Sequence, residues 1–372
     1  MDDKCFKAKK LKILIIGNSK GVFAKELQSQ LVNKGRDVYL LDFAYLELYN
    51  SRYELNDRYA KKFAAYQRIP KLRMFFRMWF IADILKDFDL VNIHVGRWYY
   101  SFILHTLKKK KVVVSFYGSD FYRATNFSKK LLLPLLKIAK TITFTNPLTK
   151  KSFLGYYEDF HYKSHICRFG LGTLDYIDKH RDKDIAKIKN HLGYSTTKKI
   201  VTCGYNATKA QQHQKIIEQL IRLPKDFLQT IQFIFPMTYG DNQNRDRVES
   251  MLAKSDLDYI VLRDFLYDDD NAYIKLASDV MINMLETDSF SGSMQEFLYA
   301  KNRVITGSWL PYEVFDVEGI IYDKIDSIDN LGEKLQEVLK RQNVNLQKNV
   351  DVIYSLSSWK NNISNWIEAY AN

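Results

Sequence analysis

The chain alternates short, continuous apolar runs with segments whose apolar residues recur at helical spacing. Strands that are apolar throughout and alternate with helices are typical of a parallel sheet covered on both faces. In the first half, helices are predicted over 21–34, 128–139 and 147–154. The predicted strands of this half are KILIIG (12–17), DVYLLDF (37–43), LVNIHV (90–95), KVVVSFYG (111–118), TITFTN (141–146) and SHICRFG (164–170).

The alternation restarts after residues 171–194, a polar, charged stretch that predicts a hinge with a short helix. Helices are expected over 211–222 and 243–254, and strands over 199–206, 230–237, 259–265, 280–285, 303–307 and 319–323. The sequence thus predicts an α/β protein of two Rossmann-like, doubly wound parallel-sheet domains facing a central cleft. Their expected ranges are 1–175 and 176–355, with a terminal helix over 356–372. Ligands bind such sheets at the carboxyl ends of the strands.

Composition and cysteine usage narrow the class of protein. Of the 372 residues, 46% are hydrophobic, which is enough for two buried cores. No run of eighteen apolar residues occurs, and the N-terminal run LKILII is too short for a signal peptide, so we expect a cytoplasmic protein. Cys5, Cys167 and Cys203 are far apart, which suits a reducing compartment and offers neither a metal cluster nor a disulfide framework.

Positive charge is concentrated in the first 150 residues, which contain 29 Lys and Arg against 12 Asp and Glu. Such a field attracts nucleic acid, anionic lipid or phosphate-bearing substrates. The basic and aromatic segments 69–86 and 127–140 predict either helices on an anionic membrane or core helices with a basic outer side. For 69–86 we favour the membrane, because the excess charge lies in the same half. No known DNA- or RNA-binding motif is present, so nucleic acid is not the expected partner.

The segment DSFSGSMQEFLYAKNRVITG (288–307) carries the strongest chemical signal. Asp288 and Glu296 are separated by seven residues and flank a loop that leads into a predicted helix. A Ser- and Gly-rich loop at a helix N-terminus offers free N–H groups and the positive end of the dipole to a diphosphate or a sugar hydroxyl. The alternative is an ordinary strand–loop–helix with serine caps. The loop residues concerned are Ser291, Gly292 and Ser293.

This element resembles that of the large retaining group of GT-B glycosyltransferases, which carry two glutamates at this spacing before a strand that ends in glycine. Asp288 stands in place of the first glutamate. The resemblance implies that Asp288 contacts the donor sugar and that Glu296 binds the nucleotide ribose. The aspartate and the SFSGS loop are closer to outlying families, including the Fuc4NAc transferase of enterobacterial common antigen synthesis. They leave retaining and inverting transfer both open.

Two further loops of the second half fit the resemblance. In VTCGYNATKAQQHQ (201–214), a strand is followed by Asn206, Lys209 and His213. The matching GT-B loop carries two cations that neutralise the departing diphosphate, which implies this role for Lys209, with His213 as the second cation. The alternative is a solvated lysine and a histidine on a helix face. In FIFPMTYGD (233–241), Tyr239 and Gly240 either flank the nucleotide or form a plain turn.

Three loops of the first half border the cleft in the same comparison. Gly17, in GNSKG, follows the first strand but makes only a weak dinucleotide fingerprint. Asp120, in YGSD, either handles the proton of the acceptor hydroxyl or caps a turn. His94 ends another strand just before Arg97 and is a candidate catalytic residue or a structural one. The acids 268–270 precede a helix and are expected to cap its first turn.

The sequence therefore predicts a glycosyltransferase that moves a sugar from a UDP- or dTDP-sugar to a lipid-linked glycan or another surface-glycan acceptor, as in O-antigen or capsule synthesis. The resemblance implies no cofactor and no metal, and a terminal helix, with Trp359 and Trp366, that returns to the N-terminal acceptor domain. An anionic membrane is the expected further partner, contacted from the inner face. Three alternatives remain: a non-catalytic GT-B homologue acting as a scaffold or chaperone, a basic nucleic-acid-binding protein, and a GT-B epimerase.

Overall fold

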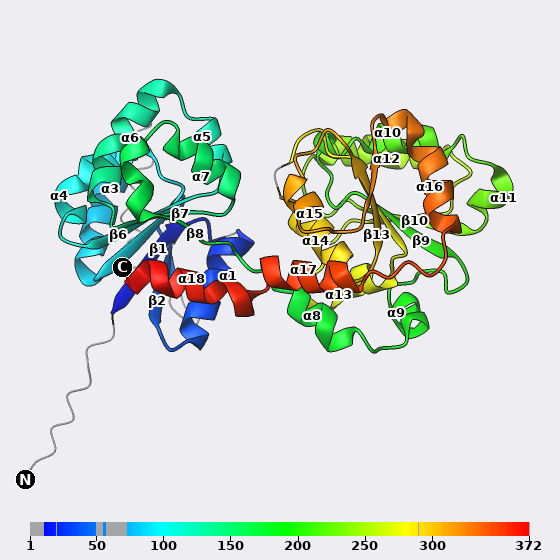
Figure 1. Ribbon diagram of the computed structural model, residues 1–372, viewed down its shortest axis with the longest axis horizontal. Coiled ribbons are helices and arrows are strands. Elements are labelled where there is room, and N and C mark those ends of the chain that lie inside the picture. The colour runs from blue at the N-terminus through cyan, green and yellow to red at the C-terminus, as the bar shows by residue number, and fades with distance from the viewer. Residues whose placement is uncertain (1–10, 20, 50–54, 57–72, 289, 372) are drawn as a thin grey trace, which may run out of the picture. The chain divides into compact units, whose positions relative to one another are not determined.

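A computed structural model describes residues 11–19, 21–49, 55–56, 73–288 and 290–371. The chain divides into two compact units, the first made of residues 1–170 and 359–372 and the second of residues 171–358. The expected boundaries lay a few residues away, at 175/176 and 355/356. Both units are α/β, each built around its own sheet (Figure 1).

The sheet of the first unit has the strand order β4-β3-β2-β1-β5-β6-β7-β8. All neighbouring strands are parallel except the pairs β2–β3 and β3–β4, which are antiparallel. The order changes direction between β1 and β5. The strands are β1 (Lys12–Gly17), β2 (Asp37–Asp42), β3 (Leu48–Tyr49), β4 (Leu55–Asn56), β5 (Leu90–His94), β6 (Lys111–Phe116), β7 (Thr141–Phe144) and β8 (Ser164–Ile166).

Two helices, α1 (Val22–Asn33) and α18 (Trp359–Ala371), cover one face of this sheet (Figure 1). In α18, the Trp359 indole N–H donates to Glu26 and the buried Trp366 donates to the carbonyl of Arg168. The C-terminal helix therefore completes the first core. The other face packs against α3 (Arg73–Ile84), η1 (Leu85–Asp87), η2 (Trp98–Ile103), α4 (Leu104–Leu107), α6 (Asn126–Ile138), α7 (Pro147–Leu154) and η3 (Glu158–Lys163).

The second unit contains a fully parallel sheet in the order β11-β10-β9-β12-β13-β14. Numbered from its first strand, this is the 3-2-1-4-5-6 order of the doubly wound nucleotide-binding fold, which changes direction between β9 and β12. The strands are β9 (Lys199–Cys203), β10 (Ile231–Pro236), β11 (Tyr259–Leu262), β12 (Val280–Asn283), β13 (Arg303–Gly307) and β14 (Asp323–Ile325).

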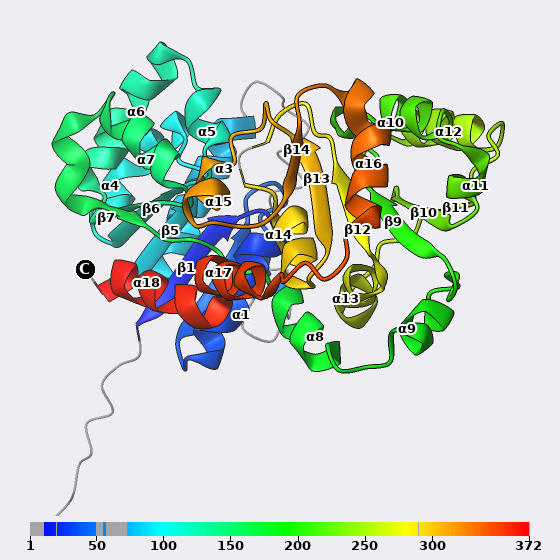
Figure 2. The same cartoon turned by 45° about the vertical axis from the view of Figure 1, so that its right-hand side comes forward.

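Helices cover both faces of the second sheet, and each face has its own apolar core (Figures 1 and 2). One face carries α10 (His213–Leu220), α11 (Lys225–Leu228), α12 (Asn242–Leu252) and α16 (Leu331–Lys340). The other carries α8 (Thr173–His180), α9 (Ile185–His191), α13 (Asp268–Ala277), α14 (Gly292–Tyr299), α15 (Glu313–Val317) and α17 (Gln347–Ser357).

Three local predictions differ from the structure. The strand expected over 319–323 is absent, and β14 begins only at Asp323. Gly319 instead has a φ of +71°, and the Ile320 amide donates to the Phe315 carbonyl, so these residues end α15 in a left-handed cap. The stretch 171–194 forms two helices instead of one. The short antiparallel strands β3 and β4 were not predicted.

Candidate functional site

The second sheet changes direction between β9 and β12, and the chain leaves β9 through a glycine. Gly204 has a φ of +68°, in the left-handed region that favours glycine. A Cβ atom at this position would lie 2.7 Å from Nε2 of His213 and 2.8 Å from Oε1 of Gln211. Any other residue at 204 would need both the left-handed backbone and a shift of these two side chains, so glycine is favoured at the start of the loop that follows.

Asn206 organises that loop. Its Oδ1 accepts hydrogen bonds from the backbone N–H and the hydroxyl of Thr208, at 2.9 and 2.7 Å. The Ala207 amide donates to the carbonyl of Tyr239, which links this loop to the one after β10. Gly240, with a φ of +120°, would place a Cβ only 2.9 Å from the Thr208 nitrogen. The structure thus brings the predicted residues Asn206, Tyr239 and Gly240 together at the carboxyl edge of the sheet.

Lys209 and His213 differ in charge. The Lys209 ammonium is largely exposed and has only a loose ion pair with Asp241, at 3.6 Å. His213 is 1% exposed, and burial lowers its pKa to about 4. The imidazole is therefore neutral at pH 7, because water cannot reach it to solvate a charge. This corrects the expectation that His213 supplies a second cation next to Lys209.

The loop after β12 leads into α14, whose N-cap is Ser291. The Ser291 hydroxyl accepts from the Met294 amide at 3.2 Å, and Gly292 and Ser293 lie in the first turn. Ser289 lies outside the described residues. Asp288 accepts a 2.6 Å hydrogen bond from the hydroxyl of Tyr312, which in turn accepts from Asn283 on β12. This chain of contacts fixes the Asp288 carboxylate next to the serine loop.

Tyr205 completes this side of the site. Burial, together with the nearby charge of Asp288, raises its pKa to about 12. Its hydroxyl therefore stays protonated and can donate a hydrogen bond. Sequence reasoning missed both Tyr205, although it lies within the segment 201–214, and Tyr312, because only the fold brings them to Asp288.

Glu296 lies on α14 and forms an ion pair with Lys275 of α13, at 3.2 Å. The two side chains are 13% and 7% exposed. The Lys275 ammonium also donates to Asn271, one turn earlier on α13. Sequence reasoning missed Lys275 as well, although a lysine between Ile274 and Leu276, in the apolar second half of this helix, was the available signal.

In the first unit, His94 lies inside a buried polar network at the end of β5. Its Nε2 accepts from the Asn92 amide at 3.0 Å, and its Nδ1 lies 2.7 Å from the hydroxyl of Tyr117. Asn92 also donates to Tyr370 of α18. The ring stacks on Trp366, and burial lowers its pKa to about 3. His94 is thus neutral with both nitrogens engaged, an arrangement that suits packing and leaves neither nitrogen free to take a substrate proton.

Asp120 holds the turn that follows β6. Its Oδ1 accepts from the amides of Gly118, at 2.8 Å, and of Tyr117 and Phe121, at 3.1 Å each. Burial raises the pKa of this carboxyl group, while the three amides act in the opposite direction. Gly17 ends β1, and a Cβ atom at this position would lie 3.4 and 3.5 Å from the Cβ atoms of Ala24 and His94, which is ordinary contact distance. Lys20 of the same loop lies outside the described residues.

The acidic run 268–270 forms the first turn of α13, as expected. Asp269 is paired with His180 and Lys179, and Asp270 with His191. Within the described part of the chain, no group of three or more His, Cys, Asp or Glu side chains is placed to hold a metal ion. Across the same residues, no helix has both the length and the apolar composition needed to cross a bilayer.

No model of a known protein family matches the chain, and no curated protein sequence matches it. Solved structures do match. A glycosyltransferase from Rickettsia africae superposes with a TM-score of 0.71 at 16% identity, over 97% of this chain and 98% of that one. The Anabaena protein HepE, solved with UDP, gives a TM-score of 0.69 at 10% identity, over 97% of this chain and 100% of that one. The chain has the GT-B fold. A third GT-B match, sucrose-phosphate synthase from Thermosynechococcus elongatus, gives a TM-score of 0.67 at 12% identity, over 97% of this chain and 98% of that one.

Proposed function

We propose that this GT-B protein is a glycosyltransferase that moves a sugar from a UDP- or dTDP-sugar to a lipid-linked glycan acceptor. The observation that carries the proposal is the convergence of Tyr205, Asp288 and Ser291 where the second sheet changes direction. Open parallel sheets bind their ligands at this position. HepE, which shares the fold, was solved with UDP and with UDP-glucose.

The donor would be held by fixed dipoles and one cation. The free N–H groups of Gly292 and Ser293 lie at the start of α14, which is the positive end of the helix dipole, and suit a diphosphate. Lys209 adds a mobile positive charge. Negative charge grows on the nucleoside diphosphate as the glycosidic bond to it breaks, so these groups stabilise the transition state more than the ground state. No divalent metal is required in this scheme.

Two carboxylates complete the donor site. Glu296 would accept hydrogen bonds from the ribose hydroxyls through the oxygen that Lys275 leaves free. Asp288, oriented by Tyr312, would contact the sugar that is transferred. These roles match those that the sequence resemblance implies.

The lipid-linked acceptor is supported by an exposed aromatic face on the first unit. Phe75 and Trp79 of α3, Phe102 of η2 and Phe127 of α6 are all more than half exposed. The 3-10 helix η2 packs against both α3 and α6, so the three elements that carry these rings are neighbours. Exposed aromatic rings together with a positive field suit an anionic membrane surface. Residues 69–72 of the predicted membrane segment lie outside the described residues.

Transfer to a short-chain prenyl diphosphate-linked sugar, from a panel of UDP- and dTDP-sugars, tests the proposal. We expect one donor to give a new glycosidic product, and Lys209→Ala and Glu296→Ala to lose most of the rate while remaining folded. Full transfer by either variant would refute the assigned donor site. Tight binding of a protein partner without any turnover of a nucleotide-sugar would favour the scaffold alternative.

Membrane binding is tested separately by sedimentation with phosphatidylcholine vesicles, with and without phosphatidylglycerol. The wild-type chain is expected to sediment with the anionic vesicles only. The double variant Trp79→Ala/Phe127→Ala should stay in solution while its UDP affinity is unchanged. Equal sedimentation of the variant would show that this face does not contact the membrane.

A further inference from the structure

Two buried polar side chains of the second unit lack the hydrogen bonds that buried polar groups normally form. Gln211 ends the 3-10 helix η4 (Lys209–Gln211), and His213 begins α10. Their exposed fractions are 0% and 1%. Among the described residues, these are the two in which both polar side-chain atoms are buried without a hydrogen bond. Each such atom costs stability, so a contribution to stability does not explain the pair.

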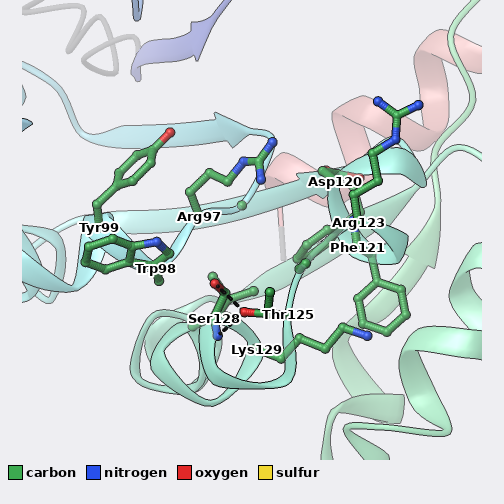
Figure 3. A pocket seen from close by; sticks show the side chains of 13 residues that line it. Arg97, Trp98, Tyr99, Asp120, Phe121, Arg123, Thr125, Ser128 and Lys129 are labelled. Atoms are coloured by element: carbon green, nitrogen blue, oxygen red, sulfur yellow. Dashed lines mark hydrogen bonds between the residues drawn. The ribbon is translucent and has the colours of Figure 1, made fainter.

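The cavity of the first unit, with a volume of about 320 Å³, shows the ordinary situation for polar side chains (Figure 3). In its wall, Asp120 accepts hydrogen bonds from three backbone amides. The Lys129 ammonium lies 4.1 Å from the centroid of the Phe121 ring, and the Arg123 guanidinium points away from the cavity. These charged groups are engaged within the chain or turned away from the cavity, unlike the pair in the second unit.

Gln211 and His213 approach the same point next to Gly204. A Cβ atom on Gly204 would lie 2.7 Å from Nε2 of His213 and 2.8 Å from Oε1 of Gln211. The two polar atoms therefore lie close to each other on one side of the Gly204 backbone. Between them, Gln212 has a φ of +56°, which is uncommon for a residue other than glycine. Its Nε2 donates to the Met284 carbonyl at 2.7 Å, which links this turn to the loop after β12.

Gln211 is also a neighbour of Tyr205 in the proposed donor site. Burial and the charge of Asp288 raise the pKa of Tyr205, whereas the side chains of Ser291 and Gln211 lower it. A hydrogen-bond donor lowers the pKa of a phenol because it stabilises the phenolate. The Gln211 amide therefore lies near the Tyr205 oxygen, although it forms no hydrogen bond of regular geometry. The side chains follow one another in the order His213, Gln211, Tyr205, and the last lies beside the N-cap of α14.

The position of this pair behind the donor site gives a physical reason for it. Apolar groups of similar size in place of buried, unpaired polar groups are neutral or stabilising. Polar groups that cost stability concentrate at functional sites, where stability is given up for binding or catalysis. Hydrogen bonds that serve a reaction are often poorly aligned until the ligand binds.

We propose that Gln211 and His213 are positioning residues that direct the Tyr205 hydroxyl toward the diphosphate of a nucleotide-sugar. The diphosphate accepts the hydrogen bond of Tyr205, and the Tyr205 oxygen accepts from the Gln211 amide. The other end of the Gln211 carboxamide pairs with the ring of His213. The inference rests on the proposed function for the identity of this ligand. Neither Gln211 nor His213 touches the diphosphate, so both act through Tyr205.

A double-mutant cycle tests whether Gln211 acts through Tyr205. UDP and dTDP are titrated calorimetrically into the full chain, and the one that binds more tightly is used for the variants. Tyr205→Phe should weaken its binding about tenfold, because a hydrogen bond to a charged group is lost. Gln211→Met and His213→Leu should each weaken binding about fivefold in the wild-type background. In the Tyr205→Phe background, neither should cause a further loss. Equal losses in both backgrounds would overturn the proposal.

Urea unfolding supplies a second readout, which separates positioning from a structural role. Gln211→Met should leave the unfolding midpoint unchanged or raise it, because no hydrogen bond is lost. Asn349→Leu is the matched control. Asn349 is equally buried in the same unit, but both of its polar side-chain atoms pair with the backbone of Ile321. The control should lower the midpoint and leave the nucleotide affinity unchanged. An equal fall of the midpoint in Gln211→Met would make Gln211 a structural residue and overturn the proposal.

The titrations also distinguish failure of this inference from failure of the proposed function. Nucleotide binding that is equally tight in the wild type, Gln211→Met and His213→Leu would overturn the inference and leave the proposed function standing. No binding of UDP, dTDP or any of their sugars by the wild-type chain would refute the proposed function, and the inference with it.

Discussion

The Lys275 ammonium lies 3.2 Å from a carboxylate oxygen of Glu296, and both side chains are almost fully withdrawn from water. The pair joins α13 to α14 and fixes the Glu296 side chain beneath the serine loop. Removing one member of a buried pair leaves an uncompensated charge, whereas replacing both by apolar residues is often tolerated. Structural and binding roles of the pair can therefore be separated by mutation.

We expect Lys275→Met to lower the free energy of unfolding by about 3 kcal/mol and to weaken UDP binding. The double variant Lys275→Met/Glu296→Leu should recover most of that stability but none of the UDP affinity. Urea unfolding and calorimetric titration measure the two quantities. Restored UDP affinity in the double variant would show that Glu296 is only structural.

The hydrogen bond from Tyr312 to Asp288 leads to a prediction about catalysis. Tyr312→Phe should lower kcat about tenfold, since it removes one hydrogen bond to a charged group. Asp288→Asn should lower kcat by about a hundredfold or more, because it removes the charge itself. Both variants should bind UDP within a few fold of the wild type.

Tyr322→Phe is the matched control for Tyr312→Phe, because the Tyr322 hydroxyl makes a similar 2.7 Å hydrogen bond to the exposed Asp316. Steady-state kinetics with the active donor should show no change for it. If Tyr312→Phe behaved like this control, Asp288 would not need Tyr312 for its position.

Two glycines with nearly the same backbone conformation allow a steric test of the loop after β9. Gly204 and Gly193 have φ angles of +68° and +70°, but only at Gly204 would a Cβ atom meet other side chains. Gly193→Ala should cost about 1 kcal/mol from backbone strain alone. Gly204→Ala should cost more, by about a further 1–3 kcal/mol, and should weaken UDP binding. Equal losses of stability would mean that the loop moves freely away from His213 and Gln211.

The buried His94 makes the stability of the first unit depend on pH. Its pKa falls from an ordinary value near 6.5 to about 3 on folding, so only the unfolded chain takes up this proton between those values. Above about pH 6.5, His94 does not change the free energy of unfolding. As the pH falls from there toward 3, His94 lowers the free energy of unfolding by up to about 1.4 kcal/mol per pH unit.

We expect His94→Gln to flatten the pH dependence of unfolding between pH 6.5 and 4, and the exposed His105→Gln to leave it unchanged. Tryptophan fluorescence during urea unfolding is a suitable probe, because Trp366 stacks on the His94 ring. An unaltered pH profile in His94→Gln would show that His94 takes up its proton equally well in the folded chain.

The sequence predicted the central strands of both sheets well, because uninterrupted apolar runs such as KILIIG and VMIN are compatible with burial on both faces. Short strands at the edge of a sheet and the residues that end a helix were harder to predict. The strands β3 and β4 have two residues each and show no alternation. The apolar run 319–323 resembles a strand, yet Gly319 and Ile320 form the cap of α15.

Within the proposed site, the resemblance pointed to Asp288 and Glu296, since both belong to one loop and helix. Lys275, Tyr205 and Tyr312 come from other segments, and only the folded chain places them there. The charge of His213 could not be predicted either, because burial, not its residue type, sets its pKa.

Hydrogen exchange of the full chain with and without its nucleotide-sugar tests the central claim most directly. A panel of UDP- and dTDP-sugars is first screened by thermal shift to find the donor. The account predicts that this donor slows amide exchange in residues 204–210, 239–241 and 291–296, and that Asp288→Asn retains most of this protection. Protection confined to other segments, or no protection by any nucleotide-sugar, would contradict it.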